Sequence, residues 1–155
     1  SDEDKKSGFV TTNFTDEQLS RLINEKGFFV CLQKDKVIGY VTSASWDFWK
    51  KWPMYQHMIS ELPNLKYKDV INVSNSYQYG PVCVDKEYRG LGIIEKLFDI
   101  SVMEMGKRYN YIITFINKAN SRSFFVHTKK LKFEVINEFV YNMKKYYELI
   151  YEISK

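Results

Sequence analysis

A strand that runs through a two-glycine turn directly into a long helix most restricts what this chain can form. The strand ends at residues 82–84, the turn contains Gly90 and Gly92, and apolar side chains recur at helical spacing over residues 92–107. Glycines let a backbone approach a ligand, and the first N–H groups of a helix carry partial positive charge. The stretch therefore predicts an anion site suited to a diphosphate. It lacks the third glycine of a dinucleotide fingerprint and the Lys-Ser/Thr pair of a P-loop.

The remaining segments alternate between strand and helix patterns. Thr15 and Gln18 form a capping-box pattern, which predicts a helix that ends near Asn24. Pro81 follows Gly80 inside a strand pattern and cannot donate to a ladder, so a bulge or a splayed edge is expected there. The expected strands are residues 28–33, 37–45, 76–84, 111–116, 133–141 and 146–153, and further helices are expected through 58–62 and over 121–131. This order predicts a single α/β domain over residues 1–155, built on a mixed sheet.

Composition excludes several classes of protein. The 155 residues are 45% hydrophobic and 17% aromatic, which is enough for a core and too apolar for a disordered chain. Cys31 and Cys83 lie far apart and form no metal-like or redox pair, so we expect reduced thiols, no metal site and a cytoplasmic protein. The longest apolar runs are far below the roughly 20 residues of a membrane span, so no membrane partner is expected.

Two segments resemble the conserved motifs of one enzyme family. Arg89-Gly90-Leu91-Gly92, after the strand with Val82 and Val84, resembles motif A of the GNAT acyltransferase superfamily. Downstream, the segment that resembles motif B contains Asn117, Asn120, Ser123, His127 and then Leu131-Lys132-Phe133. The resemblance runs from about Phe28 to the end of the chain. It implies a mixed, mostly antiparallel sheet with splayed strands, flanked by helices.

The chain departs from the family pattern at several positions. Ile94 stands where the family prefers Gly or Ala, and Lys132 replaces the common Gly before Phe133. The family also usually begins with a strand and a helix upstream of the helix at Thr15. The sequence leaves no room for both, so we expect that strand and helix to be missing or truncated.

The resemblance implies an N-acetyltransferase that uses acetyl-CoA as co-substrate. The acceptor would be a primary amine of a small molecule or a peptide, acetylated by direct transfer. The implied cofactor-binding residues, which hold the pantetheine along the strand and the diphosphate on the turn, are Val82, Cys83, Val84, Arg89, Gly90, Leu91, Gly92, Ile93, Ile94, Asn117, Asn120 and Ser123.

The catalytic residues are less clearly marked. His127 occupies the position of the family's general acid, although a histidine on an apolar helix face also fits a core role. The segment from His127 is one residue longer than the pattern, so Thr128 is the other candidate for this position. No carboxylate lies in residues 74–80, where many relatives place a base. A water relayed through Tyr79 is one candidate, and the base stays unidentified.

Other functions stay open at this point. A non-catalytic domain that binds or senses acyl-CoA would keep the same turn without a base. A nucleic-acid-binding protein ranks lower, because the net charge is only +4 and no element carries clustered Lys and Arg with interleaved aromatics. A homodimer is also open. The aromatic residues of 46–55 are either core or an acceptor wall, and the lysines at 129, 130 and 132 either face solvent or meet the 3′-phosphate of CoA.

Overall fold

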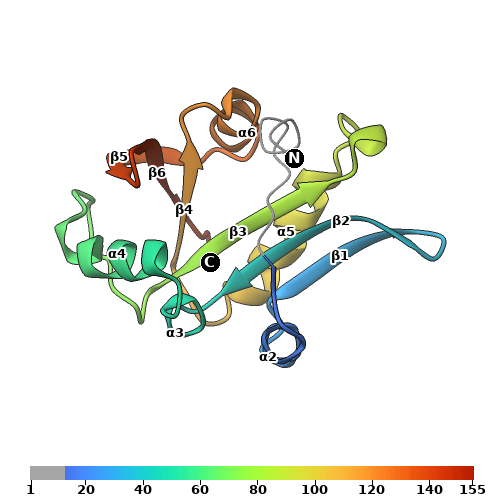
Figure 1. Ribbon diagram of the computed structural model, residues 1–155, viewed down its shortest axis with the longest axis horizontal. Coiled ribbons are helices and arrows are strands. Elements are labelled where there is room, and N and C mark those ends of the chain that lie inside the picture. Colours follow the sequence, from blue (N-terminus) through green and yellow to red (C-terminus); the bar gives the residue numbers. More distant parts are fainter. Residues whose placement is uncertain (1–12) are drawn as a thin grey trace.

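The computed structural model describes residues 13–155 (Figure 1). The expectation of a missing or truncated strand and helix before Thr15 concerns residues 1–12, which lie outside the described part. Six strands form one sheet in the order β1-β2-β3-β4-β6-β5. Their bounds are β1 Phe28–Gln33, β2 Lys36–Ala44, β3 Ser76–Val84, β4 Tyr111–Asn117, β5 Glu134–Tyr141 and β6 Lys144–Glu152. The only parallel pair among them is β3 with β4, so the predicted mixed, mostly antiparallel sheet is confirmed.

Local sequence signals mark the first residues of α2 and α4. Thr15 accepts a hydrogen bond from the Gln18 N–H and the Gln18 side chain accepts one from the Thr15 N–H, so the capping box is present. The helix through residues 58–62 begins earlier than expected, because Pro53 occupies its first position. The helices are α2 Asp16–Asn24, α3 Trp46–Trp49, α4 Pro53–Glu61, α5 Ile93–Met105 and α6 Ser121–Phe125. None of the helices within residues 13–155 has the length and apolar character needed to cross a bilayer.

Each face of the sheet is covered by its own hydrophobic core. One core joins α2, α3 and α4 to the sheet and includes Trp49, Met58 and Ile150. The other lies under α5 and α6 and includes Phe98 and Leu149. Most of the aromatic side chains in residues 46–55 are fully buried in the first core, so their core role is confirmed: Trp46, Phe48, Trp49 and Tyr55.

Strands β3 and β4 separate soon after they begin. They pair only from Ser76 to Gln78, with Ile113 the last partner on β4, and then diverge (Figure 1). On its other side β3 shifts register against β2 at Gly80 and Pro81, because Val41 pairs with Val82 and Ser43 pairs with Tyr79. The expected bulge and the expected splay are therefore both present. The splay opens a wedge between β3 and β4 in the middle of the sheet.

Candidate active site

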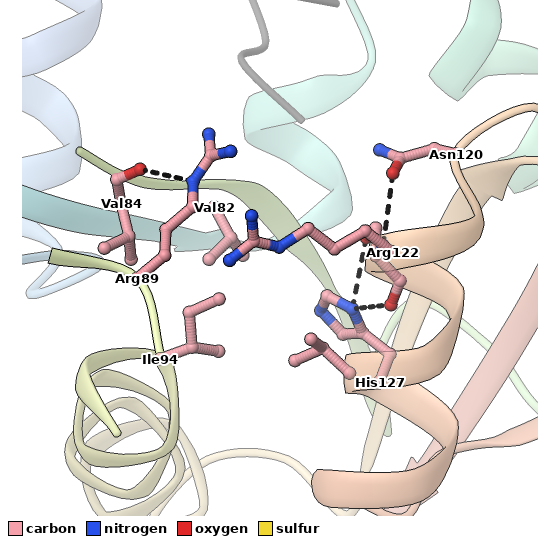
Figure 2. A pocket seen from close by; sticks show the side chains of 9 residues that line it. Val82, Val84, Arg89, Ile94, Asn120, Arg122 and His127 are labelled. Atoms are coloured by element: carbon pink, nitrogen blue, oxygen red, sulfur yellow. Dashed lines mark hydrogen bonds between the residues drawn. The ribbon is translucent and has the colours of Figure 1, made fainter. Parts of the chain in front are cut away.

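Two adjoining cavities lie between the end of β3, the start of α5 and α6. The first has a volume of about 50 Å³ and the second about 220 Å³. The first is lined by Val82, Val84, Arg89, Ile94, Asn120, Arg122, Ser123, Val126 and His127 (Figure 2). The second shares Val84, Arg89, Ile94, Arg122 and Val126, and adds Tyr88, Gly90, Gly92, Ile93, Glu95, Phe125 and Lys130. The segments that resemble motifs A and B therefore line the same space.

Beyond Gln78, the β3 edge that faces the wedge pairs with no strand among residues 13–155. The Asp85 N–H donates to the Ile38 carbonyl of β2 at 2.8 Å. The direction of the backbone groups alternates along a strand, so the groups of the residues one and three positions before Asp85 point away from β2 and towards the wedge. Those residues are Val84 and Val82, and the Val84 carbonyl accepts a bond from Arg89 Nε on that side. Because β4 has diverged, an extended ligand can pair with this edge as a further strand would.

The two-glycine turn is built to present N–H groups. Gly90 and Gly92 have φ values of 79° and 80°, a left-handed conformation that favours glycine. Within residues 13–155 the N–H groups of Gly90, Leu91 and Gly92 donate to no backbone carbonyl. The first-turn N–H groups of α5 also lack helical acceptors. A Cβ added at Gly90 would meet no atom within 4 Å, so the space beside it is open to a ligand.

Positive charge surrounds this turn. The guanidinium groups of Arg89, in the turn before α5, and of Arg122, on α6, approach one another across the cavity (Figure 2). Burial and, after it, the charge of Arg122 lower the pKa of Arg89. Lys130 adds a third cation to the second cavity, where Glu95 is the carboxylate. Unpaired N–H groups with three cations suit a polyanion such as the phosphates of acetyl-CoA, so the residues present fit that co-substrate.

Arg122 was missed by the sequence reasoning, although one signal pointed to it. It lies in the first turn of α6, where a cation opposes the helix dipole.

The asparagines of the motif B segment serve local structure first. Asn120 caps α6, because its Oδ1 accepts the Ser123 N–H at 3.1 Å, and it also lines the first cavity. Asn120 therefore serves both as the cap of α6 and as part of the cavity lining. Asn117 instead accepts the Ala119 N–H at 2.9 Å and lies outside the lining of both cavities.

The extra residue noted in the sequence is absorbed by a π-helical turn. After α6 the chain continues as a π-helix over Val126–Lys130, in which the Leu131 N–H bonds the Val126 carbonyl five residues back. Such turns are rare and occur often at functional sites. The turn carries both candidates for the acid position, His127 and Thr128. Of the two, His127 lines the first cavity and Thr128 lines neither of the two cavities described here, since its hydroxyl donates to the Phe124 carbonyl at 2.7 Å.

His127 lies at the inner end of the first cavity and is only 5% exposed. Its Nδ1 is 2.8 Å from the Ser123 carbonyl oxygen, which requires a proton on Nδ1. Burial lowers the pKa of His127 to about 4, and the Ser123 contact opposes that shift. The ring is therefore neutral at neutral pH, with a lone pair on Nε2. A general-acid role would have to use the scarce protonated form, so it stays a prediction.

Tyr79 is close to His127 but does not line either cavity. Its ring centroid lies 5.6 Å from that of His127, and the side chain is 1% exposed. Burial raises the pKa of the Tyr79 hydroxyl far above its usual value, and the buried oxygen has no hydrogen-bond partner within residues 13–155. A proton relay through this hydroxyl stays a prediction.

Two further expected residues lie away from the cavities. Cys83 pairs with Tyr40 across the sheet and alternates in direction with Val82 and Val84, so it points to the opposite face. Leu91 is 65% exposed on the outside of the turn. The backbone of either residue remains able to meet a ligand.

Comparisons with known proteins agree with this geometry. A model of the acetyltransferase (GNAT) family matches residues 2–133. No curated protein sequence matches the chain.

Among solved structures, the chain is similar in fold to Ard1 from Thermoplasma volcanium, with a TM-score of 0.64 at 14% identity over 94% of this chain and 84% of that one. It is similar to the NatC complex bound to Gag peptide and CoA, with a TM-score of 0.63 at 14% identity over 98% and 92%. It is also similar to yncA, a putative acetyltransferase from Salmonella typhimurium with acetyl-CoA, with a TM-score of 0.62 at 15% identity over 95% and 78%.

Proposed function

Because the chain belongs to the GNAT family of acetyltransferases, we propose that it moves an acetyl group from acetyl-CoA to a primary amine by direct transfer in a ternary complex. One observation carries this proposal. The unpaired edge of β3, the turn with Gly90 and Gly92, and the cations Arg89 and Arg122 all border one continuous pair of cavities. A thioester arm and a diphosphate need this combination of an open strand edge and a polyanion site.

The residues of the site have separate tasks in this proposal. The turn and the start of α5 bind the diphosphate through N–H groups, and Arg89 and Arg122 neutralise its charge. The outward-facing backbone of Val82 and Val84 pairs with the pantetheine amides. Acetyl-CoA supplies an activated acyl group. The N–H groups of that edge are also the donors available to the carbonyl oxygen when negative charge develops on it.

Proton demands in this site are modest. The attacking amine must lose a proton. The departing thiol has an ordinary pKa of about 8.5, so it leaves as a thiolate and needs little help from a general acid. The neutral His127 accepts rather than donates at its Nε2, so it is suited to orient a hydrogen-bond donor in the cavity. We therefore propose that the proton transfer that needs a catalytic group is the removal of a proton from the amine.

The acceptor is proposed as a small-molecule amine or a peptide amine. The NatC structure, to which the fold is similar, holds a Gag peptide together with CoA. A peptide with a free N-terminus is therefore the first acceptor to test, followed by small primary amines.

A second candidate function is a non-catalytic acyl-CoA-binding domain. It is supported by residues 74–80, which contain no carboxylate where many relatives place a base. Release of free CoA thiol from acetyl-CoA, measured with and without a panel of amines, separates the two. Amine-dependent thiol release supports the transferase, whereas acetyl-CoA binding without release supports the binding domain.

A further inference from the structure

Strand β6 carries a buried carboxyl group that the cavities described above do not use. Glu148 is 1% exposed, and its Oε1 accepts a bond from Asn137 Nδ2 at 3.2 Å. Its Oε2 is buried and has no partner within residues 13–155. A buried carboxylate oxygen without a donor is costly, so its retention needs a reason.

The register of the sheet places Glu148 one strand away from the wedge, next to the part of β4 that has separated from β3. It pairs with Phe115 of β4, two residues beyond Ile113, where the β3–β4 ladder ends. Side chains alternate along β6, with Leu149 in the core under α5 and Ile150 in the core under α4. Glu148 therefore faces α4, on the opposite side of the sheet from His127. A group that passes through the wedge from the cavity emerges next to Phe115.

The surface around this carboxyl is aromatic. The rings of Phe115 and Tyr146 are 5.6 Å apart, Tyr146 stacks on Phe139, and the His57 ring lies 5.7 Å from that of Phe139. All four are half-buried rather than sealed in the core. Aromatic faces beside a carboxylate are the usual environment for an organic ammonium group.

The charged and titratable neighbours define the ionisation of Glu148. Burial raises its pKa to about 7, Asn137 on β5 opposes this shift, and the charge of Glu61 at the end of α4 adds to it. From β4 the neighbour is the apolar Phe115, and Tyr146 on β6 has a pKa that is raised, mainly by burial. The carboxyl is therefore half ionised near neutral pH, as a general base requires.

We propose that Glu148 is the catalytic base that takes the proton of an aliphatic primary amine entering over the aromatic rings from the α4 side. This inference rests on the proposed acetyl transfer. The ammonium N–H gives its proton to Oε2, and the neutral amine attacks the thioester carbonyl carbon. A C–N bond forms, the C–S bond breaks, CoA leaves as a thiolate, and the amide nitrogen loses its second proton to solvent. Glu148 then releases its own proton to solvent.

The test compares the protein with Glu148→Gln, which keeps the side-chain volume and an acceptor for Asn137. The acceptor probes are 2-phenylethylamine and a short peptide with a free N-terminus. We expect kcat to fall by about 10²–10⁴-fold, the usual range for a lost acid–base group. The pH profile of kcat/KM should lose an inflection near 7, while the Kd of acetyl-CoA stays the same.

Two further variants separate chemistry from structure. Glu148→Asp keeps an ionisable group with a shorter reach, so it should keep an inflection with a lower kcat. Glu61→Gln removes a nearby negative charge, so it should move the inflection to lower pH, which a purely structural carboxyl would not do. Wild-type turnover and an unchanged profile in Glu148→Gln would overturn the role of Glu148 alone. Absence of acetyl-CoA binding or of turnover in the unmodified protein would overturn the proposed function, and this inference with it.

Discussion

The Nδ1 atom of His127 lies 2.8 Å from the carbonyl oxygen of Ser123, one turn earlier in the same helix. A carbonyl only accepts, so the imidazole proton is on Nδ1 and Nε2 carries a lone pair. The buried ring also packs edge-on against Tyr79 and Phe133. The contacts of His127 thus resemble those of a satisfied core residue at the boundary of a cavity.

The first prediction follows from that contact. His127→Phe keeps the ring volume and removes both nitrogens, and we expect turnover per folded molecule to stay within about tenfold of the original. Steady-state kinetics normalised to folded protein would measure it. A loss of about 10²–10⁴-fold would instead identify His127 as the general acid. Thr128→Val is the matched control, and a large loss there alone would assign the acid position to Thr128.

The second prediction concerns stability at low pH. The pKa of His127 in the folded protein is lowered to about 4 from 6.5, so the folded state binds this proton less well than the unfolded state. The neutral His127 ring stabilises the folded state fully above pH 6.5. This stabilisation, at most about 3 kcal/mol, is lost as the pH falls through 4. When the free energy of unfolding is measured with urea between pH 7.5 and 4.5, His127→Phe should lose less of it on acidification than the original protein does. Parallel curves would contradict the neutral buried ring.

The third prediction is that Glu148 makes the stability of the protein depend on pH in the opposite direction. Its pKa is raised to about 7, so its contribution is present below pH 4.5 and is lost as the pH rises through 7. Glu148→Gln should therefore be more stable than the original at pH 8.5, by up to about 3 kcal/mol, with the difference shrinking towards pH 4.5. The same urea series measures it. A difference that does not change with pH would mean that Glu148 has an ordinary pKa.

The element pattern and the two-glycine turn were readable from the sequence because they depend on local signals. The Thr15 capping box, the glycines at 90 and 92, and the proline at 81 each act within a few residues. Glu148 was not readable as a candidate base, because its position one strand away from the wedge depends on the pairing of β6 with β4. Residues 74–80 on β3, where many relatives place a base, contain no carboxylate, whereas Glu148 lies two strands away in the sheet.

The length of the motif B segment shows another limit. The segment has one residue more before Phe133 than the family pattern, and the sequence alone does not show how the helix accommodates this extra residue. The π-helical turn over Val126–Lys130 does so by widening the helix locally, and this sets which of His127 and Thr128 faces the cavity. That outcome depends on packing against the core, which no local pattern encodes.

The fourth prediction tests the cation that sequence reasoning missed. Arg122→Gln should weaken acetyl-CoA binding by about 10–100-fold, the value of one charge-assisted hydrogen bond of about 1.5–3 kcal/mol. The salt dependence of binding should also decrease. Arg21→Gln is the control, since Arg21 is engaged with Asp47 and Glu25 on the other side of the molecule. Equal affinities in the original and Arg122→Gln would remove Arg122 from the phosphate site.

The fifth prediction assigns the 3′-phosphate of CoA to Lys130, which lines the second cavity. CoA should raise the Tm more than dephospho-CoA does in the original protein, because native-state binding stabilises by mass action. Lys130→Ala should make the two ligands equivalent. Lys129→Ala, an exposed neighbour outside both cavities, should keep the difference. A similar loss for both ligands in Lys130→Ala would place the 3′-phosphate elsewhere.

Calorimetric titration of acetyl-CoA into a pair of Gly90 variants tests the central claim most directly. Gly90→Asn and Gly90→Asp have nearly the same shape and tolerate the positive φ better than most residues, and the added Cβ meets no atom. They differ by one negative charge beside the turn. The original protein and Gly90→Asn should bind one acetyl-CoA per chain, and Gly90→Asp should bind at least about tenfold more weakly than Gly90→Asn, since one repulsive charge contact costs about 1.4 kcal/mol or more. Equal affinity in the two variants, or no binding by the original protein, would contradict the assignment of this turn as the diphosphate site of an acetyl-CoA-dependent transferase.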